Sequence, residues 1–268
     1  MRTAAFLLVC LVALPAFGAQ IDDITDLPDG QVFVLGEYHD SAIQHLNQAQ
    51  AIRAISPAAV VFEQLTPDVA AKLTSEDRAS PEQLAKATGW ADSGWPEMDI
   101  YWPVFEAVGR AAIYGAWVKS EDLRASVGQG AAAVFGPEAA RFGLDQSLPA
   151  GQQEIREAEQ MEAHCNAMPA EMMGGMVESQ RLRDAALAQA ALTALQDTGG
   201  PVVVITGNGH ARVDWGMPYL LGLAAPDVQV VSVGQLEQVP DDQPPYDLWL
   251  VTAPTERDDP CAAFGTQE

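Results

Sequence analysis

Two short apolar runs that each end at a glycine constrain the fold of this chain most strongly. Residues 31–35 (QVFVL) precede Gly36, and residues 201–206 (PVVVIT) precede Gly207. Continuous apolar runs of this length, bounded by turn residues, are typical of strands that are buried on both faces of a parallel sheet. The two runs therefore predict two inner strands of an α/β protein.

The rest of the chain alternates strands with helices. A helical stretch at 41–55, ended by Pro57, leads to an apolar run at 59–62, and this order predicts a βαβ unit. Further apolar runs predict strands at 111–118, 228–233 and 246–251. We therefore predict an α/β fold with a mainly parallel central sheet flanked by helices.

One long helical region interrupts the alternation. Residues from about 120 to 197 are rich in Ala, Leu and Gln, which predicts a helical cap or insertion over the sheet. The segment 89–103 is rich in Trp, Pro and Tyr, and we expect a structured loop there. Because no stretch has the composition of a linker, residues 20–268 are expected to form a single domain.

The same tetrapeptide pattern follows both glycine-ended strands. The first run leads into Gly36-Glu37-Tyr38-His39, and the second leads into Gly207-Asn208-Gly209-His210. Glu63 closes the strand at 59–62 in a similar position. Because the carboxyl ends of parallel strands line the ligand crevice of an α/β sheet, we expect these imidazoles and carboxylates to converge there.

Two imidazoles and two carboxylates at one edge support two kinds of chemistry. They provide the nitrogen and oxygen ligands of a divalent transition metal. They also provide a general base and its orienting carboxylate, as in a hydrolase of the esterase or protease type. Packing does not require one tetrapeptide twice, so we expect a functional site, formed by Glu37, His39, Glu63 and His210.

The first 19 residues have the pattern of a cleaved secretory signal peptide. Arg2 precedes an apolar run, and the small residues Gly18 and Ala19 end it. Val9 stands where a lipoprotein site requires a small residue, so we do not expect Cys10 to carry a lipid. We therefore predict a periplasmic or secreted protein without a transmembrane segment in the mature chain.

Cleavage leaves two cysteines, Cys165 and Cys261. A pair of cysteines in an exported chain predicts a disulfide. The formal net charge of −23 makes nucleic acid and anionic membrane surfaces unfavourable partners, because both repel such a field. The negative charge favours solubility and does not indicate a particular ligand.

The sequence resembles the ChaN-like proteins, a haem-binding-uptake branch of the superfamily that also contains the Tiki proteases, TraB/PrgY proteins and erythromycin esterases. The resemblance rests on LGEYHD at 35–40, QRLRD at 180–184 and VITGNGHARVDWGMP at 204–218. These motifs follow the family's order and cover nearly all of the mature chain. The resemblance implies a ChaN-like α/β domain, haem as a non-covalent cofactor, a role in haem or iron uptake, and a homodimer.

The resemblance also implies a set of catalytic residues if the protein is an enzyme. They are Glu37, His39, Glu63, Arg183 and His210. Counted from Gln180, Arg183 and Asp184 stand at positions i+3 and i+4, a spacing that places both on the helical face of Gln180. The segment is otherwise rich in Ala and Leu. An arginine buried there needs carboxylate partners, and we expect Glu37 or Glu63 to provide them.

No motif assigns an axial ligand for the haem. The chain lacks the CxxCH attachment motif, so a bound haem would be held without a covalent bond, by Tyr, His, Met or Cys. The candidates are the four histidines, His39, His45, His164 and His210, and the tyrosines Tyr38, Tyr101 and Tyr114. We expect Tyr38, His39, His164 and His210 to be the cofactor-binding residues. Because the chain has few basic residues, Arg183 and Arg212 are the expected partners of a propionate or another anion.

Overall fold

The strands form a single parallel sheet in the computed structural model, which describes residues 18–262. Within these residues the sheet has seven strands in the order β1-β7-β6-β2-β5-β3-β4, and each pair is parallel. The strands are β1 (Ala19–Gln20), β2 (Val32–Glu37), β3 (Ala59–Phe62), β4 (Ala112–Gly115), β5 (Val202–Gly207), β6 (Val230–Leu236) and β7 (Leu248–Val251). The α/β fold with a parallel central sheet is confirmed.

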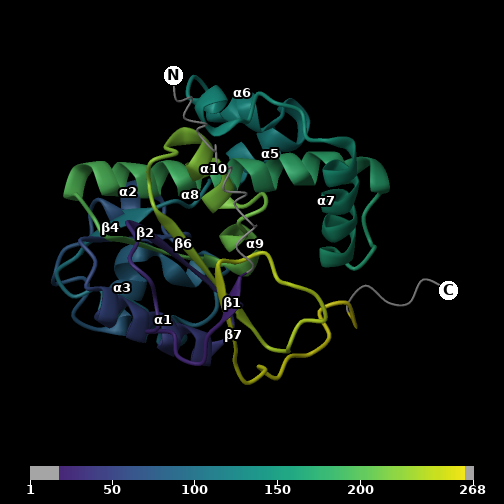
Figure 1. Ribbon diagram of the computed structural model, residues 1–268. Coiled ribbons are helices and arrows are strands. Elements are labelled where there is room, and N and C mark those ends of the chain that lie inside the picture. The colour runs from purple at the N-terminus through teal and green to yellow at the C-terminus, as the bar shows by residue number, and fades with distance from the viewer. Residues whose placement is uncertain (1–17, 263–268) are drawn as a thin grey trace, which may run out of the picture.

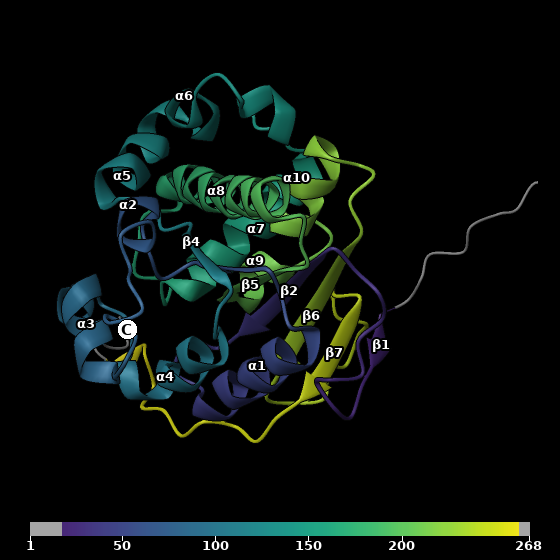
Figure 2. The ribbon, with the colours of Figure 1, turned by 90° about the vertical axis from the view of Figure 1, so that its left-hand side faces the viewer.

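Helices cover both faces of this sheet (Figures 1 and 2). One layer contains α1 (Ala42–Ile55), α3 (Pro81–Thr88) and α4 (Met98–Ala107), and α2 (Pro67–Ala70) lies beside β4 at the edge of the sheet. The rest of the chain adds α5 (Ser120–Gln129), α6 (Ala131–Phe135), α7 (Ala150–Ala163), α8 (Met173–Thr198), α9 (Asn208–Ala211) and α10 (Met217–Ala224). Short 3-10 turns lie at Trp90–Asp92, Ala139–Phe142 and Ala170–Met172.

Alternate residues of the central strands enter two separate cores. Val32 and Val34 of β2 pack in the core beneath α8. Phe33 and Leu35 of the same strand pack in the core beneath α1 and α4. This division explains the continuous apolar runs in the sequence, because a strand that is covered on both faces has no polar side.

The long helical region is part of the main fold. Helix α8 contacts β3, β4 and β5 directly, and α5, α6 and α7 pack on α8. Figure 2 shows this layer on one side of the sheet, with α1 and α4 on the other. The predicted helical region at 120–197 therefore forms one covering layer of the sheet. Within residues 18–262 no helix is long and apolar enough to cross a membrane.

The segment 89–103 differs from the prediction, because Met98–Ala107 is helix α4 and not loop. Pro103 lies inside this helix and cannot donate a backbone hydrogen bond. Tyr101 and Phe105 are nevertheless buried against α1 and the sheet. Apolar burial of this face outweighs the missing hydrogen bond.

The two ends of the chain bear on the predictions for export. The predicted signal peptide lies outside the described residues, apart from Gly18 and Ala19, and Ala19 begins β1. Cys165 and Cys261 form a disulfide, as predicted, with a Cα–Cα distance of 5.3 Å. The bond joins the segment after α7 to the C-terminal tail, and this agrees with an exported protein.

Candidate functional site

The two GxxH segments lie side by side because β2 and β5 are neighbours in the sheet. Gly36 is in register with Thr206, and Glu37 is in register with Gly207. A Cβ atom at Gly207 would lie 3.0 Å from His39 Nε2, which is too close for any residue other than glycine without a shift of the ring. The glycine of the second motif therefore lets the histidine of the first motif pack against its backbone.

Glu37 is a buried carboxylate at the centre of the first cluster. Its Oε1 accepts hydrogen bonds from the Tyr101 hydroxyl at 2.7 Å and from Gln64 Nε2 at 3.1 Å. His39 Nδ1 lies 2.9 Å from the same oxygen, and His45 Nε2 lies 3.2 Å from Oε2. Burial raises the pKa of Glu37, but the two imidazoles outweigh it and lower the pKa below its usual range. The carboxylate is therefore ionised.

His39 is partly exposed and carries a positive charge at neutral pH. Burial lowers its pKa, but the hydrogen bond to Glu37 and the charge of Glu63 outweigh burial and raise the pKa to about 9. The ring also packs edge-on against Trp95, with 4.7 Å between the ring centroids. As a cation at neutral pH, His39 can donate a proton or bind an anion, and it is not poised to accept a proton.

The raised pKa of His39 makes the stability of the protein depend on pH. The unfolded-state pKa is near 6.5 and the folded-state pKa is about 9, so the contribution of His39 is present below pH 6.5 and is lost as the pH rises through 9. We expect the free energy of unfolding to fall over this range and to fall less steeply in His39→Gln. Urea unfolding at a series of pH values measures both slopes. Equal slopes in the two proteins would contradict the assignment.

Glu63 is the carboxylate between the two motifs. Its Oε2 accepts hydrogen bonds from the Thr206 hydroxyl at 2.7 Å and from the Gly207 backbone at 2.9 Å, and its Oε1 lies 3.7 Å from His210 Nε2. Burial raises the pKa of Glu63, but the charges of His210 and His39 and both hydrogen bonds lower it overall. Glu63 thus links β3 to the motif that follows β5.

Asp184 of α8 completes the second cluster. His210 Nδ1 lies 2.7 Å from Asp184 Oδ1, and both side chains are buried. Burial raises the pKa of Asp184, and the charges of Glu63 and Asp184 overcome burial to raise the pKa of His210. His210 is therefore held between two carboxylates, from α8 and from β3.

The structure brings together Glu37, His39, Glu63 and His210, the four residues predicted to converge. Arg183 differs from the prediction. It is half-buried, close enough to His210 for its charge to lower the pKa of that imidazole, yet it forms no ion pair with Glu37 or Glu63 in the described part of the chain. The helix turns the next residue, Asp184, towards His210 instead.

The predicted anion partner Arg212 is already neutralised. Its guanidinium forms two hydrogen bonds with Asp214, at 2.9 and 2.8 Å, and lies 3.3 Å from Glu159. It also stacks on Trp215, with 3.7 Å from the guanidinium carbon to the ring centroid. These contacts leave Arg212 little capacity for an added anion.

The two candidate haem ligands outside the cluster have different surroundings. Tyr38 is 41% exposed beside His39, and the guanidinium of Arg257 lies 5.2 Å from its ring. His164 lies at the C-terminal end of α7, where its Nδ1 is 2.7 Å from the carbonyl oxygen of Gln160. His164 is therefore bound to its own helix, next to the disulfide.

The metal prediction receives no support from the geometry. Among residues 18–262, no group of three or more His, Cys, Asp or Glu side chains could hold a metal ion. The nitrogens of His39 and His210 that face Glu37 and Asp184 form imidazole–carboxylate pairs. The arrangement is suited to charge stabilisation and proton transfer.

The sequence does not predict that four further residues contact this cluster. Asp184 was noted only as a neighbour of Arg183, although an acidic residue on an apolar helix signals a buried partner. Tyr101 fell in the segment expected to be loop. Gln64 and His45 carried no pattern of their own, and the tertiary fold alone places them against Glu37.

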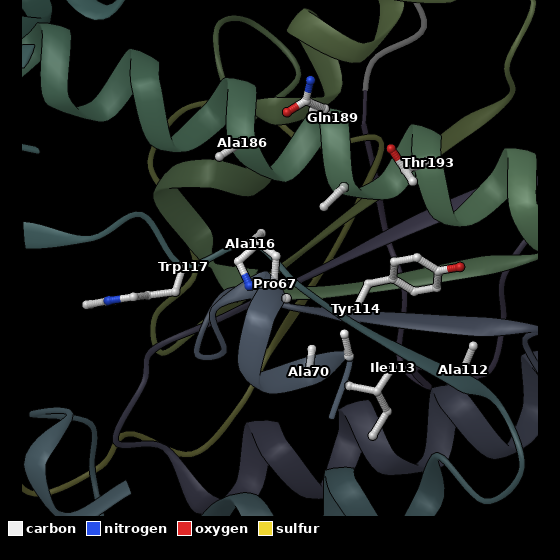
Figure 3. A pocket seen from close by; sticks show the side chains of 13 residues that line it. Pro67, Ala70, Ala112, Ile113, Tyr114, Ala116, Trp117, Ala186, Gln189 and Thr193 are labelled. Carbon is white, nitrogen blue, oxygen red and sulfur yellow. The ribbon is translucent and has the colours of Figure 1, made fainter. Parts of the chain in front are cut away.

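Cavities lie at both ends of the α8 layer. A small cavity of about 110 Å³ borders His210, Asp184 and Trp215. A separate apolar pocket of about 550 Å³ lies between β4, α2 and α8, lined by Tyr114, Trp117 and several alanines (Figure 3). None of the clustered imidazoles or carboxylates lines this second pocket, so it is not part of the site.

Together the fold and the site define a class of α/β protein with two imidazole–carboxylate pairs at the carboxyl edge of a parallel sheet. Residues 24–221 match the family described as "Haem-binding uptake, Tiki superfamily, ChaN", and the chain belongs to this family. The predicted family membership is confirmed. No curated protein matches the sequence.

One solved structure with a TM-score above 0.5 shows the same fold. ChaN of Campylobacter jejuni, whose structure describes cofacial haem binding, has a TM-score of 0.61 at 16% identity, over 82% of this chain and 86% of that chain. The type III effector HopBA1 has a TM-score of 0.48 at 10% identity, over 90% and 99%. A Bacillus cereus protein has a TM-score of 0.31 at 11% identity, over 80% and 67%.

Proposed function

We propose that the protein binds haem without a covalent bond, as an exported component of haem or iron uptake, and that Tyr38 is the axial ligand. Family membership supports haem as the ligand. The observation that carries the assignment of the ligand is the exposed phenol of Tyr38 beside the buried cluster. Tyrosine oxygen is an established axial ligand of haem iron.

The surroundings of Tyr38 fit a flat apolar ligand. Ile43 and Leu46 are exposed on one face at the start of α1, three residues apart. We propose that these two side chains and Tyr38 form one apolar patch, which we call the Tyr38 face. Within residues 18–262 the Tyr38 hydroxyl has no hydrogen-bond partner, and its backbone N–H donates to Gln44 Oε1 at 2.6 Å, which fixes the loop.

The histidines are less suitable ligands at neutral pH. His39 and His210 each have Nδ1 within hydrogen-bond distance of a carboxylate, and each has a raised pKa, so a proton occupies the nitrogen that iron would need. His210 is also buried. His164 keeps its Nε2 available but lies at the end of α7, apart from the cluster. These contacts favour Tyr38 over the three histidines.

A second copy of the chain is the natural partner of the Tyr38 face. ChaN of C. jejuni binds haem cofacially, and an exposed apolar patch that carries an axial ligand would leave one face of the haem uncovered. We propose that two copies meet through haem at this face. The strongly acidic surface disfavours such a contact without a ligand.

Replacement of Tyr38 tests the proposal. We expect Tyr38→Phe to weaken haemin binding by at least about tenfold and to shift the Soret maximum, because the iron loses its oxygen ligand. The measurement is an absorbance titration of the mature protein with haemin. The matched control is Tyr219→Phe, since Tyr219 is also exposed, at 47%, and lies on α10. Unchanged binding in Tyr38→Phe, or loss in the control alone, would contradict the assignment.

One observation favours a second function, a hydrolase that uses the same cluster. Both imidazoles pair with carboxylates and both lie near Glu63. In the part of the chain that the structure describes, buried polar atoms without hydrogen-bond partners lie in this cluster, including His45 Nδ1 and Gln64 Oε1, as in sites that hold water or a substrate. Turnover of simple esters by the wild type that is lost in His39→Ala would support this function. Absence of turnover by the wild type would exclude it for such substrates.

A further inference from the structure

Helix α7 buries a charge and exposes an apolar side chain. Arg156 is the one buried residue of its fourteen and is 5% exposed, whereas the neighbouring Ile155 is 54% exposed. Amphipathic helices place apolar residues inwards and charges outwards. An arginine is almost never buried unless it is paired, so the inverted pattern needs a reason beyond packing.

The partners of Arg156 do not account for its burial. Its nearest carboxylate oxygen is Asp184 Oδ2 at 3.8 Å, and the other oxygen of Asp184 faces His210. Within residues 18–262 the guanidinium makes no hydrogen bond with the protein, and its carbon lies 5.8 Å from the Trp215 ring centroid. Burial lowers the pKa of Arg156, and Asp184 offsets this only in part. The guanidinium is thus short of an anionic partner.

Arg156 lies where two cavities meet. One is the small cavity beside His210, of about 110 Å³, and the other has a volume of about 440 Å³. Arg156 and Trp215 line both. The larger cavity has an apolar wall, which includes Phe142, Leu144, Leu148, Leu220 and Leu223, and a polar wall, which includes Asp145, Gln146, Ser147 and Gln152. A cation whose one carboxylate partner is distant therefore faces a cavity with a large apolar wall.

Two other arginines at these cavities, Arg181 and Arg212, are committed to the fold, and Arg141 lies exposed at the rim of the larger cavity. Arg181 forms an ion pair with Glu178 at 2.7 Å and donates to the carbonyl oxygens of Gly143, Leu144 and Gln146. Arg212 is neutralised by Asp214, as described above. Arg156 is therefore the guanidinium at the junction whose donors remain available.

We propose that Arg156 binds the carboxylate of an amphipathic ligand whose apolar body occupies the larger cavity. A planar guanidinium matches a carboxylate through two parallel hydrogen bonds. Asp184 and Glu159, which border the same small cavity, would repel a doubly charged phosphate more strongly than a singly charged carboxylate. The bound carboxylate would lie next to His210. This site goes beyond the proposed haem function, because it uses none of the residues of the Tyr38 face.

The test is a calorimetric titration of the mature protein with decanoate. We expect saturable binding to the wild type, and binding weakened by at least about tenfold in Arg156→Gln, since a charge-assisted contact is lost. Decanol, which has the same chain without the charge, should bind both proteins equally. The control variant is Arg141→Gln, because Arg141 lies at the rim of the same cavity and is exposed.

A second variant covers a failure of Arg156→Gln to fold. Leu223→Glu alters a cavity residue that is 48% exposed, so it should leave the fold intact and repel decanoate. No decanoate binding to the wild type, or equal binding to the wild type and both variants, would overturn the inference. Haemin titration of the same proteins keeps the two proposals apart, because we expect the haem affinity to be unchanged by Arg156→Gln.

Discussion

Loss of the Cys165–Cys261 disulfide is expected to lower the free energy of unfolding by about 4 to 5 kcal/mol in the chain-entropy description. The bond closes a loop with a sequence separation of 96 residues, so it removes much of the freedom of the unfolded chain. The variant is the double replacement Cys165→Ala with Cys261→Ala, and the measurement is urea unfolding at equilibrium.

The matched control for the disulfide is reductant. It should destabilise the wild type and have no effect on the double variant. A loss below about 1 kcal/mol would contradict the chain-entropy account, which assigns several kcal/mol to a loop of this length. The bond also restrains the tail that carries Arg257, which pairs with Asp40 and Glu237 and lies over Tyr38. We therefore expect its loss to weaken haemin binding as well.

Asp184→Asn is expected to lower the free energy of unfolding by about 3 kcal/mol, because removal of one partner leaves a buried charge without compensation. The lost partner is the carboxylate at 2.7 Å from His210 Nδ1, and Arg156 loses its nearest anion in the same change. Thermal and urea unfolding at neutral pH measure the effect. The pKa of His210 should fall towards its usual value.

The control for this variant is Asp197→Asn on the same helix. Asp197 is exposed and accepts a hydrogen bond from the Tyr114 hydroxyl at 3.0 Å. A surface change of this kind is expected to alter stability by less than about 0.5 kcal/mol. Equal effects of the two replacements would show that the His210–Asp184 pair has no special part in the fold.

The positions of the inner strands could be predicted from the sequence because their apolar runs are long and end sharply. Residues 59–62 were expected as a strand and form β3 over the same residues. Parallel pairing then determines that Glu37, Glu63 and His210 reach one edge of the sheet. The position of these three residues therefore follows from the order of the strands, which the apolar runs in the sequence predict.

The partners of these residues could not be predicted, because they depend on helix orientation. The spacing of Gln180, Arg183 and Asp184 predicted a shared face, but not which member would point to the sheet. The structure turns Asp184 inwards and leaves Arg183 half-buried. The burial of Arg156 could not be predicted for the same reason. Helix α7 has few apolar residues, so its sequence lacks the periodicity that would indicate the buried face.

The structure shows how an acidic chain uses some of its few arginines. Arg212 and Arg257 are each paired with two acidic side chains, so the scarce cations are used within the protein. Arg156, which lines both cavities, differs from them because its one carboxylate partner, Asp184, is 3.8 Å away. The net charge disfavours anionic polymers as partners, and the site that we propose for a small carboxylate is the buried Arg156.

The central claim is that the protein binds haem through an oxygen ligand on its Tyr38 face. The most direct measurement is the absorption spectrum of the mature wild-type protein during titration with ferric haemin. We predict a saturable change of the Soret band, with the charge-transfer bands of high-spin iron bound to tyrosinate, both lost in Tyr38→Phe. A wild-type spectrum that stays the sum of free haemin and protein throughout the titration would contradict the account.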